Sequence, residues 1–182
     1  MRKTGKIGVL LIAATMALGM TACGGSENKT ETDTAAPAAT TEAKAEISGA
    51  NETWGEFKEV FVPSDMTLTG GSQIDKESKK DFMLQGKDNP SVYMMFSIKD
   101  DEEKCKSDVE TTKKMNQESN PQDVTLTAGS LSWSGVAYKY GGTTDCFQMY
   151  AKVGDKYVTV MSGYNAYDAE KTEKVLGSIK LQ

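Results

Sequence analysis

The sequence predicts an α+β fold: a single domain in which two helices cover an antiparallel sheet. Short segments rich in β-branched and aromatic residues recur along residues 51–182, between clusters of Gly, Pro, Asn and Asp, as is typical of strands and turns. Two other segments carry apolar residues at helical spacing. This stretch of about 130 residues has the common size of one domain. Runs of strands separated by single helices favour an α+β arrangement.

The first half of the domain is predicted to form four strands. Pro63 ends the first of them, because proline has no N–H to donate within a sheet. Gly70 stops the second, and the loop at residues 86–90 joins the third and fourth as a hairpin. Both faces of the fourth strand are partly apolar, which predicts a central place in the sheet. These strands cover residues 57–63, 66–69, 82–85 and 92–98.

A helix is predicted over residues 100–118. Asp100 can cap its N-terminus, and Glu103 three residues later completes a variant of the capping box. The acidic side chains of this first turn also suit the positive end of the helix dipole. A modest apolar stripe gives the helix one side that faces the core, formed by Cys105, Val109, Thr112 and Met115.

Four more strands, a second helix and a closing strand complete the prediction. The strands cover residues 124–127, 135–140, 145–152 and 157–162. Residues 153–156 connect the last two as a tight hairpin. The second helix covers residues 168–176, and a short strand at residues 178–181 closes the domain.

Four segments of this order resemble the PsbP-like family, a group of small α/β/α sandwiches that includes many bacterial lipoproteins. They are Phe61-Val62-Pro63 at the start, the strand ending at Ile98 before the Asp100 helix, Gly135-Val136-Ala137-Tyr138, and Val175-Leu176-Gly177-Ser178-Ile179-Lys180-Leu181 at the end. The resemblance implies a sandwich fold. It implies no activity and no catalytic residue, because one fold hosts unrelated functions.

The N-terminus has the features of a secretion signal. Three cations among the first six residues precede an apolar run at residues 7–20, which at about 1.5 Å per residue is shorter than the roughly 30 Å of a bilayer core. Small residues follow the run, as in signal peptides. Residues 20–23, Met-Thr-Ala-Cys, resemble the lipobox of bacterial lipoproteins, with Met where Leu is usual. The resemblance implies cleavage after Ala22 and a diacylglycerol thioether on Cys23. The alternative is an ordinary secreted protein with a chance cysteine there.

Three segments are thus predicted: a lipoprotein signal peptide at residues 1–22, the lipidated Cys23 with a flexible linker to residue 50, and the α+β domain at residues 51–182. The linker consists of Gly, Ser, Thr, Ala and Glu with almost no bulky apolar residue, so it cannot offset its ordering entropy. Two acyl chains hold a protein stably on a membrane. We therefore expect the domain on the extracytoplasmic face of the cell membrane.

The charge of the chain argues against a nucleic-acid partner. The formal net charge is -5, and removal of the signal cations Arg2, Lys3 and Lys6 takes it to about -8. Proteins that bind nucleic acids concentrate positive charge to neutralise phosphates. An acidic surface mainly favours solubility.

Two cysteines remain once Cys23 is lipidated, namely Cys105 and Cys146. An even pair outside the cytoplasm can form a disulfide. Both can equally be small buried hydrophobic residues. The sequence leaves these two alternatives open.

The sequence contains no recognisable catalytic constellation, metal site or cofactor motif. It has no histidine, the usual general base near neutral pH and the commonest zinc ligand. Methionines on predicted strands suggest a soft-metal site at first, but neighbours on a strand point to opposite faces, so Met94 and Met95 cannot chelate one ion. We expect the methionines to fill the core, namely Met83, Met94, Met95, Met149 and Met161.

Aromatic residues near predicted loops are the remaining candidates for a binding site. Trp133, Tyr164 and Tyr167 can stack on sugars or anchor a protein partner if they are exposed. The simpler interpretation is that they pack the ends of strands and the second helix. We expect a non-enzymatic lipoprotein that binds a partner at the cell envelope, with a solute- or glycan-binding accessory protein as the alternative.

Overall fold

The structure is a computed structural model that describes residues 46–70, 79–163 and 168–182. The chain divides into two units, residues 1–43 and 44–182, and all described residues belong to the second. In chain order the elements are β1 (Gly49–Trp54), β2 (Phe57–Pro63), β3 (Met66–Gly70), β4 (Asp81–Gly86), β5 (Tyr93–Lys99), α1 (Glu102–Met115), the 3-10 turn η1 (Gln117–Ser119), β6 (Gln122–Ala128), β7 (Leu131–Tyr140), β8 (Thr144–Val153), β9 (Lys156–Ser162), α2 (Ala169–Ser178) and β10 (Lys180–Leu181).

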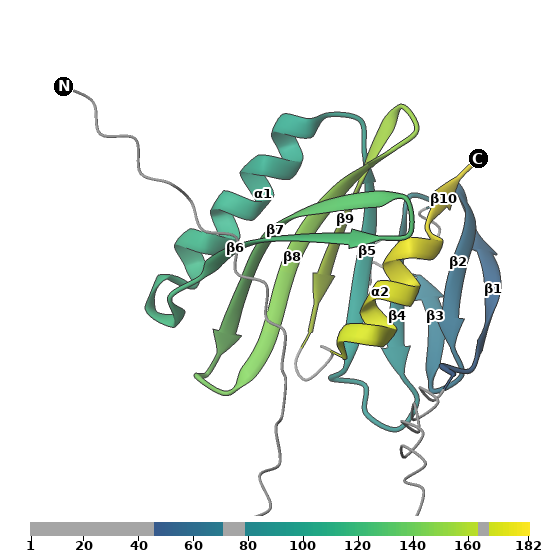
Figure 1. The fold of residues 1–182 in the computed structure, drawn as a ribbon, viewed down its shortest axis with the longest axis horizontal. Helices are drawn as coiled ribbons and strands as arrows, with labels where there is room; N and C mark the ends of the chain where they lie inside the picture. Colours follow the sequence, from purple (N-terminus) through teal and green to yellow (C-terminus); the bar gives the residue numbers. More distant parts are fainter. Residues whose placement is uncertain (1–45, 71–78, 164–167) are drawn as a thin grey trace, which may run out of the picture. The chain divides into compact units, whose positions relative to one another are not determined.

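The strands form two antiparallel sheets (Figure 1). The larger has seven strands in the order β3-β4-β5-β9-β8-β7-β6, and the smaller has three in the order β1-β2-β10. Strand β5 lies inside the large sheet between β4 and β9, as its two apolar faces predict. Between β8 and β9, Val153 pairs with Lys156, so the predicted tight hairpin is confirmed.

The main core lies on the side of the large sheet that faces β2 and α2. Phe57 of β2 meets Phe82 of β4 edge-on at 4.6 Å between ring centroids, and Phe82 stacks on Phe96 of β5 at 4.5 Å. All three rings are fully buried. Val175 and Leu176 of α2 complete this core. Such aromatic pairs add about 0.5 to 1.5 kcal/mol each beyond the area that they bury.

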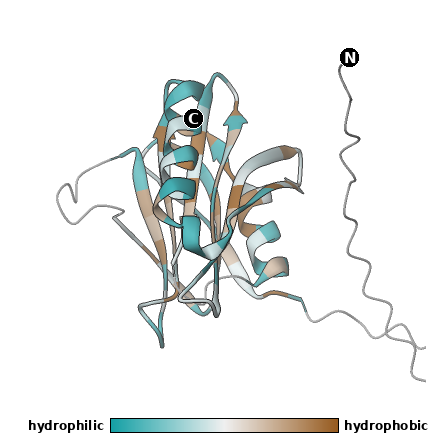
Figure 2. Ribbon diagram, turned by 90° about the vertical axis from the view of Figure 1, so that its left-hand side faces the viewer, coloured by the Kyte–Doolittle hydropathy of each residue, from teal (hydrophilic) through white to brown (hydrophobic). Residues whose placement is uncertain are grey.

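Helix α1 covers the opposite side of the large sheet, packing against β5, β7, β8 and β9. The fold class is therefore α+β, a single domain with antiparallel sheets and two helices, as the sequence predicts. In Figure 2 the hydrophobic stretches lie mainly along the strands. Within the described residues, neither helix has the length and apolarity needed to cross a bilayer.

The structure corrects two details of the first helix. Its N-cap is Asp101, whose Oδ1 accepts a hydrogen bond from the Glu103 N–H at 2.9 Å, and the prediction that Asp100 caps it was wrong. Cys105 and Val109 of the predicted stripe are buried, whereas Met115 is 80% exposed. The helix ends at Met115, and Asn116 leads the chain into a 3-10 segment.

Strand β1 was not predicted. Gly49 and Ala50, assigned to the linker on composition, pair with Pro63 and Val62 of β2. The sequence of β1, Gly-Ala-Asn-Glu-Thr-Trp, has almost no apolar alternation because the strand lies at the edge of the small sheet with mostly exposed side chains. Backbone pairing to β2 orders it instead.

Candidate functional site

The side of the large sheet that carries α1, here called the α1-side face, is the candidate functional site. Side chains alternate between the two faces of a strand, so the residues of each strand that do not enter the main core point here. Helix α1 packs over β5 and β7 to β9, and among the described residues no comparable packing of α1 against β3 or β4 is found. Helix α1 consequently leaves the α1-side face only partly covered, at β3 and β4.

A row of three methionines crosses the α1-side face. Met83 of β4 lies directly opposite Met95 of β5, and Met95 lies directly opposite Met161 of β9. All three side chains are partly buried and partly exposed. Residues directly opposite each other in antiparallel strands have Cβ atoms about 4.5 to 5.5 Å apart. We call Met83, Met95 and Met161 the methionine row.

A groove of about 380 Å³ lies beside the methionine row, between α1 and the sheet. Its apolar lining residues are Met95, Val160 and Met161, and the other residues that line it are polar. Small-ligand pockets are usually lined mainly by apolar side chains, and the lining of this groove is more polar than that. The polar residues are Asp81, Ser97, Lys99, Asp108, Gln148 and Thr159.

Helix α1 holds one wall of the groove through two side-chain contacts. The Thr112 hydroxyl donates a hydrogen bond to Oε1 of Gln148 on β8 at 2.6 Å. The Lys99 ammonium of β5 lies 3.7 Å from a carboxylate oxygen of Asp108 on α1. The one cation of the groove lining is therefore paired with an acid, which leaves little net positive charge near the methionines.

Tyrosines border the other side of the methionine row. Tyr93 of β5 accepts a backbone hydrogen bond from Gly163 N–H at 2.7 Å. A Cβ at Gly163 would run into the Tyr93 ring, so the glycine leaves room for that ring to lie across the strand. Burial raises the pKa of the nearby Tyr138 hydroxyl, and interactions with Cys146 and Tyr93 raise it further. Along β5, Met95 thus lies between Tyr93 and the groove residue Ser97.

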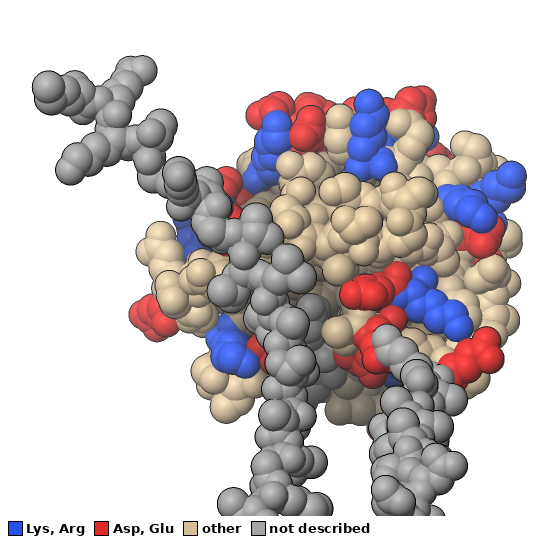
Figure 3. Space-filling model, in the orientation of Figure 1, with Lys and Arg blue, Asp and Glu red and all other residues tan. Residues whose placement is uncertain are grey.

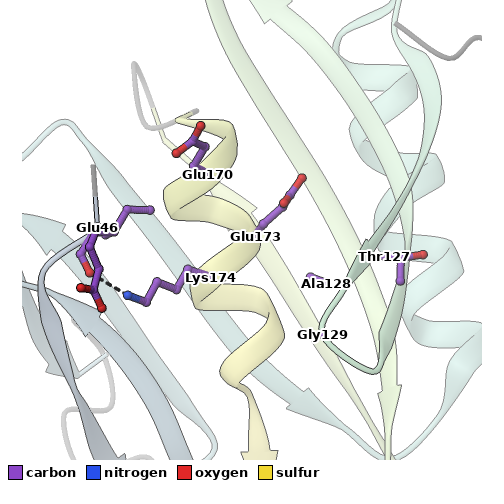
Figure 4. A pocket seen from close by; sticks show the side chains of 8 residues that line it. Glu46, Thr127, Ala128, Gly129, Glu170, Glu173 and Lys174 are labelled. Atoms are coloured by element: carbon purple, nitrogen blue, oxygen red, sulfur yellow. Dashed lines mark hydrogen bonds between the residues drawn. The ribbon is translucent and has the colours of Figure 1, made fainter. Parts of the chain in front are cut away.

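A second cavity, of about 460 Å³, lies beside α2 (Figure 4). The Lys174 ammonium donates to the Ile47 carbonyl oxygen at 2.7 Å and lies 4.3 Å from the centre of the Phe61 ring. Glu170 and Glu173 point away from Lys174 in Figure 4 and do not converge on one point. We interpret this cavity as structural, because the hydrogen bond from Lys174 to Ile47 holds the segment before β1 in place.

Trp133 is not an exposed loop residue. It lies within β7 and is fully buried in the main core, in line with the simpler interpretation of packing, and it offers no exposed ring to a ligand. Strand β7 begins at Leu131, four residues before the predicted start, because residues 131–134 pair with β6. Tyr164 and Tyr167, the other two predicted contacts, lie outside the described residues.

Cys105 and Cys146 are free thiols, and both are buried. Of the two alternatives that the sequence left open, the structure therefore has the buried thiols and not the disulfide. Burial raises the pKa of Cys105 to about 11, with Asp108 contributing to the rise, and burial also raises the pKa of Cys146. The reactive thiolate is therefore scarce near neutral pH, and both residues act as small hydrophobic side chains.

Charged side chains of both signs are interspersed on the molecular face shown in Figure 3. Some of the described ion pairs are between two exposed partners, such as Lys139 with Asp145 at 2.6 Å. Exposed pairs of this kind contribute about 0 to 1 kcal/mol each.

Among the described residues, no group of three or more Cys, Asp or Glu side chains is arranged to hold a metal ion.

The fold is similar to two solved structures. One is the solution structure of cyanobacterial PsbP (CyanoP) from Synechocystis sp. PCC 6803, with a TM-score of 0.46 and 10% identity over 81% of this chain and 100% of that chain. The other is a crystal structure from Bacteroides thetaiotaomicron VPI-5482, with a TM-score of 0.43 and 13% identity over 74% of this chain. The present chain spans about half, 48%, of the Bacteroides chain.

At 10 to 13% identity these likenesses concern the fold alone. The resemblance to PsbP expected from the sequence recurs here as a similarity between structures. No protein-family model matches the chain. No curated protein matches it in sequence.

The methionine row is the feature that reasoning from the sequence missed. Alternation along the strands separates Met94 from Met95, but it does not say which residues of different strands lie opposite each other. The observed register brings three of the five methionines together on one face, while Met94 and Met149 are buried in the main core. The expectation of core filling is thus confirmed for Met94 and Met149 only.

Proposed function

We propose that this protein is a lipoprotein held at the extracytoplasmic face of a membrane by acyl chains on Cys23. The observation that carries the proposal is the N-terminal sequence: cations, a short apolar run and the segment Met20-Thr21-Ala22-Cys23. Two acyl chains anchor a protein stably, because each buried methylene contributes about 0.8 kcal/mol.

The domain that follows is proposed to be a non-catalytic binding module. The lack of any histidine removes the most common acid–base group. The partly covered α1-side face supports a binding role, because partly exposed methionines lie there beside polar side chains that a hydrogen bond and an ion pair hold in place.

The alternative function, glycan binding through loop aromatics, depends mainly on Trp133. Stacking on a sugar requires an exposed ring face. Trp133 is fully buried, so it cannot supply one without unfolding β7. We therefore place the binding site on the α1-side face.

Replacement of Cys23 by serine is expected to release the protein from the membrane. A serine hydroxyl cannot form the thioether that carries the diacylglycerol, so the chain loses both acyl chains. Fractionation of cells that express each form measures the effect: the parent chain sediments with membranes, and Cys23→Ser does not.

The matched control is Cys105→Ser, which changes a cysteine in the domain and leaves the anchor in place. This variant is expected to stay with the membranes. Equal membrane association of the parent chain and Cys23→Ser contradicts the proposed anchor.

A further inference from the structure

We propose that the methionine row, Met83, Met95 and Met161, binds a Cu(I) ion through three thioether sulfurs. The inference rests on the proposed binding role of the α1-side face and names the ligand of that face. It requires no change in the backbone, because the three side chains already share one face of three neighbouring strands.

The register of the strands carries the first step. Met83 and Met95 are direct partners across β4 and β5, and Met95 and Met161 are direct partners across β5 and β9. Their Cβ atoms are about 4.5 to 5.5 Å from one neighbour to the next. Each methionine has three rotatable bonds, so its sulfur can move across the α1-side face toward a point that all three sulfurs can reach.

The ligand chemistry carries the second step. Thioether sulfur is a soft, uncharged donor, and soft sulfur ligands select Cu(I) over the harder divalent ions that prefer carboxylate, carbonyl and water. Three neutral sulfur donors in a trigonal arrangement do not neutralise the ion, so the complex keeps the single positive charge of Cu(I). The neighbouring lysine of the groove, Lys99, is paired with Asp108 at 3.7 Å, which limits repulsion of that charge.

Partial burial carries the third step. Met94 and Met149 are 0% and 2% exposed and belong to the main core, whereas the methionines of the row are partly exposed. An ion can therefore reach the row from solvent through the adjoining groove.

Titration of the full chain with Cu(I), without oxygen and against a coloured Cu(I) chelator, tests the proposal. The Cys23→Ser chain is used so that an unmodified thiol at this position does not compete. We expect one Cu(I) per chain. Each of Met83→Leu, Met95→Leu and Met161→Leu is expected to weaken binding about 10- to 100-fold or more, since loss of a residue that only orients a ligand already has that effect.

Met94→Leu is the matched control. It makes the same chemical change one residue from Met95, but on the opposite face of β5, and should leave Cu(I) affinity unchanged. Exchange of Met for Leu conserves volume and usually costs less than about 1.5 kcal/mol, so all variants should fold. Far-UV circular dichroism checks this.

A second readout locates the ion without any change in the row. In protein labelled with ¹³C at the methionine methyl groups, Cu(I) is expected to shift the signals of Met83, Met95 and Met161. The signals of Met94 and Met149 should stay in place. If Cu(I) leaves the three row signals unshifted, or if the triple Leu variant still binds one equivalent with parental affinity, the inference is wrong.

These outcomes are separate from those of the proposed anchor. A chain that loses its membrane association in Cys23→Ser but does not bind Cu(I) retains the proposed lipoprotein role without this ligand. A chain that binds Cu(I) at the methionine row but never acquires acyl chains retains the ion site and loses the anchor.

Discussion

Replacing Trp133 by alanine is expected to lower the free energy of unfolding by about 3 to 5 kcal/mol. The indole is fully buried in the main core, and its removal leaves a large cavity there. Its Nε1 has no hydrogen-bond partner among the described residues, so the loss comes from packing alone. The free energy of unfolding of a domain is typically about 5 to 15 kcal/mol, which makes the change severe. Urea denaturation followed by far-UV circular dichroism measures it.

Tyr140→Ala is the matched control, because it removes an aromatic residue at the far end of the same strand, where the side chain is 49% exposed. Its expected cost is within about 0.5 to 1 kcal/mol, as for most surface changes. Equal costs for the two variants would show that Trp133 is outside the core, and would restore it as a candidate contact for a ligand.

Replacing Gly135 by alanine is expected to cost about 3 kcal/mol, because the added methyl group has no space. A Cβ at this position would clash with the carbonyl oxygen of Gln148 and lie 2.6 Å from Cα of Met149. Both are backbone atoms of β8, the neighbouring strand, which cannot move aside as a flexible side chain does. Thermal and urea unfolding measure the loss.

Gly154→Ala separates this steric effect from the conformational cost of losing a glycine. Gly154 has a φ of 68° in the β8–β9 turn, and a Cβ there meets nothing within 4 Å. Its cost is expected to be about 1 to 2 kcal/mol, from the left-handed backbone alone. A Gly135 variant no less stable than the Gly154 variant contradicts the close approach of β7 and β8.

The order of elements could be predicted because local signals and tertiary structure agree over most of the domain. Strand β2 covers the predicted residues, and α2 begins at Ala169, one residue after its predicted start, because Asp168 is its N-cap. Failures occur where the decisive contact is distant in sequence. Strand β1 is ordered by backbone pairing with β2, and its own composition is that of a linker.

The candidate site could not be predicted for the same reason. Trp133 is part of the sheet because β7 begins at Leu131. The turn before Leu131 has little apolar character, so the sequence did not indicate this early start. The methionine row depends on the register of β4, β5 and β9. Alternation gives the face of each residue, but the pairing between strands comes from the packed sheet as a whole.

The proposed anchor and the proposed ion site are compatible with one role. Acyl chains on Cys23 would hold the domain near the membrane, where the α1-side face would present its soft-metal ligand set. The proposal therefore requires first that the chain reaches the membrane surface through Cys23.

Mass spectrometry of the N-terminal peptide from protein isolated from its native membrane tests this requirement most directly. The account predicts a chain that begins at Cys23 and carries the mass of a diacylglycerol group on its sulfur. A free thiol at Cys23, or a chain that retains residues 1–22, contradicts it.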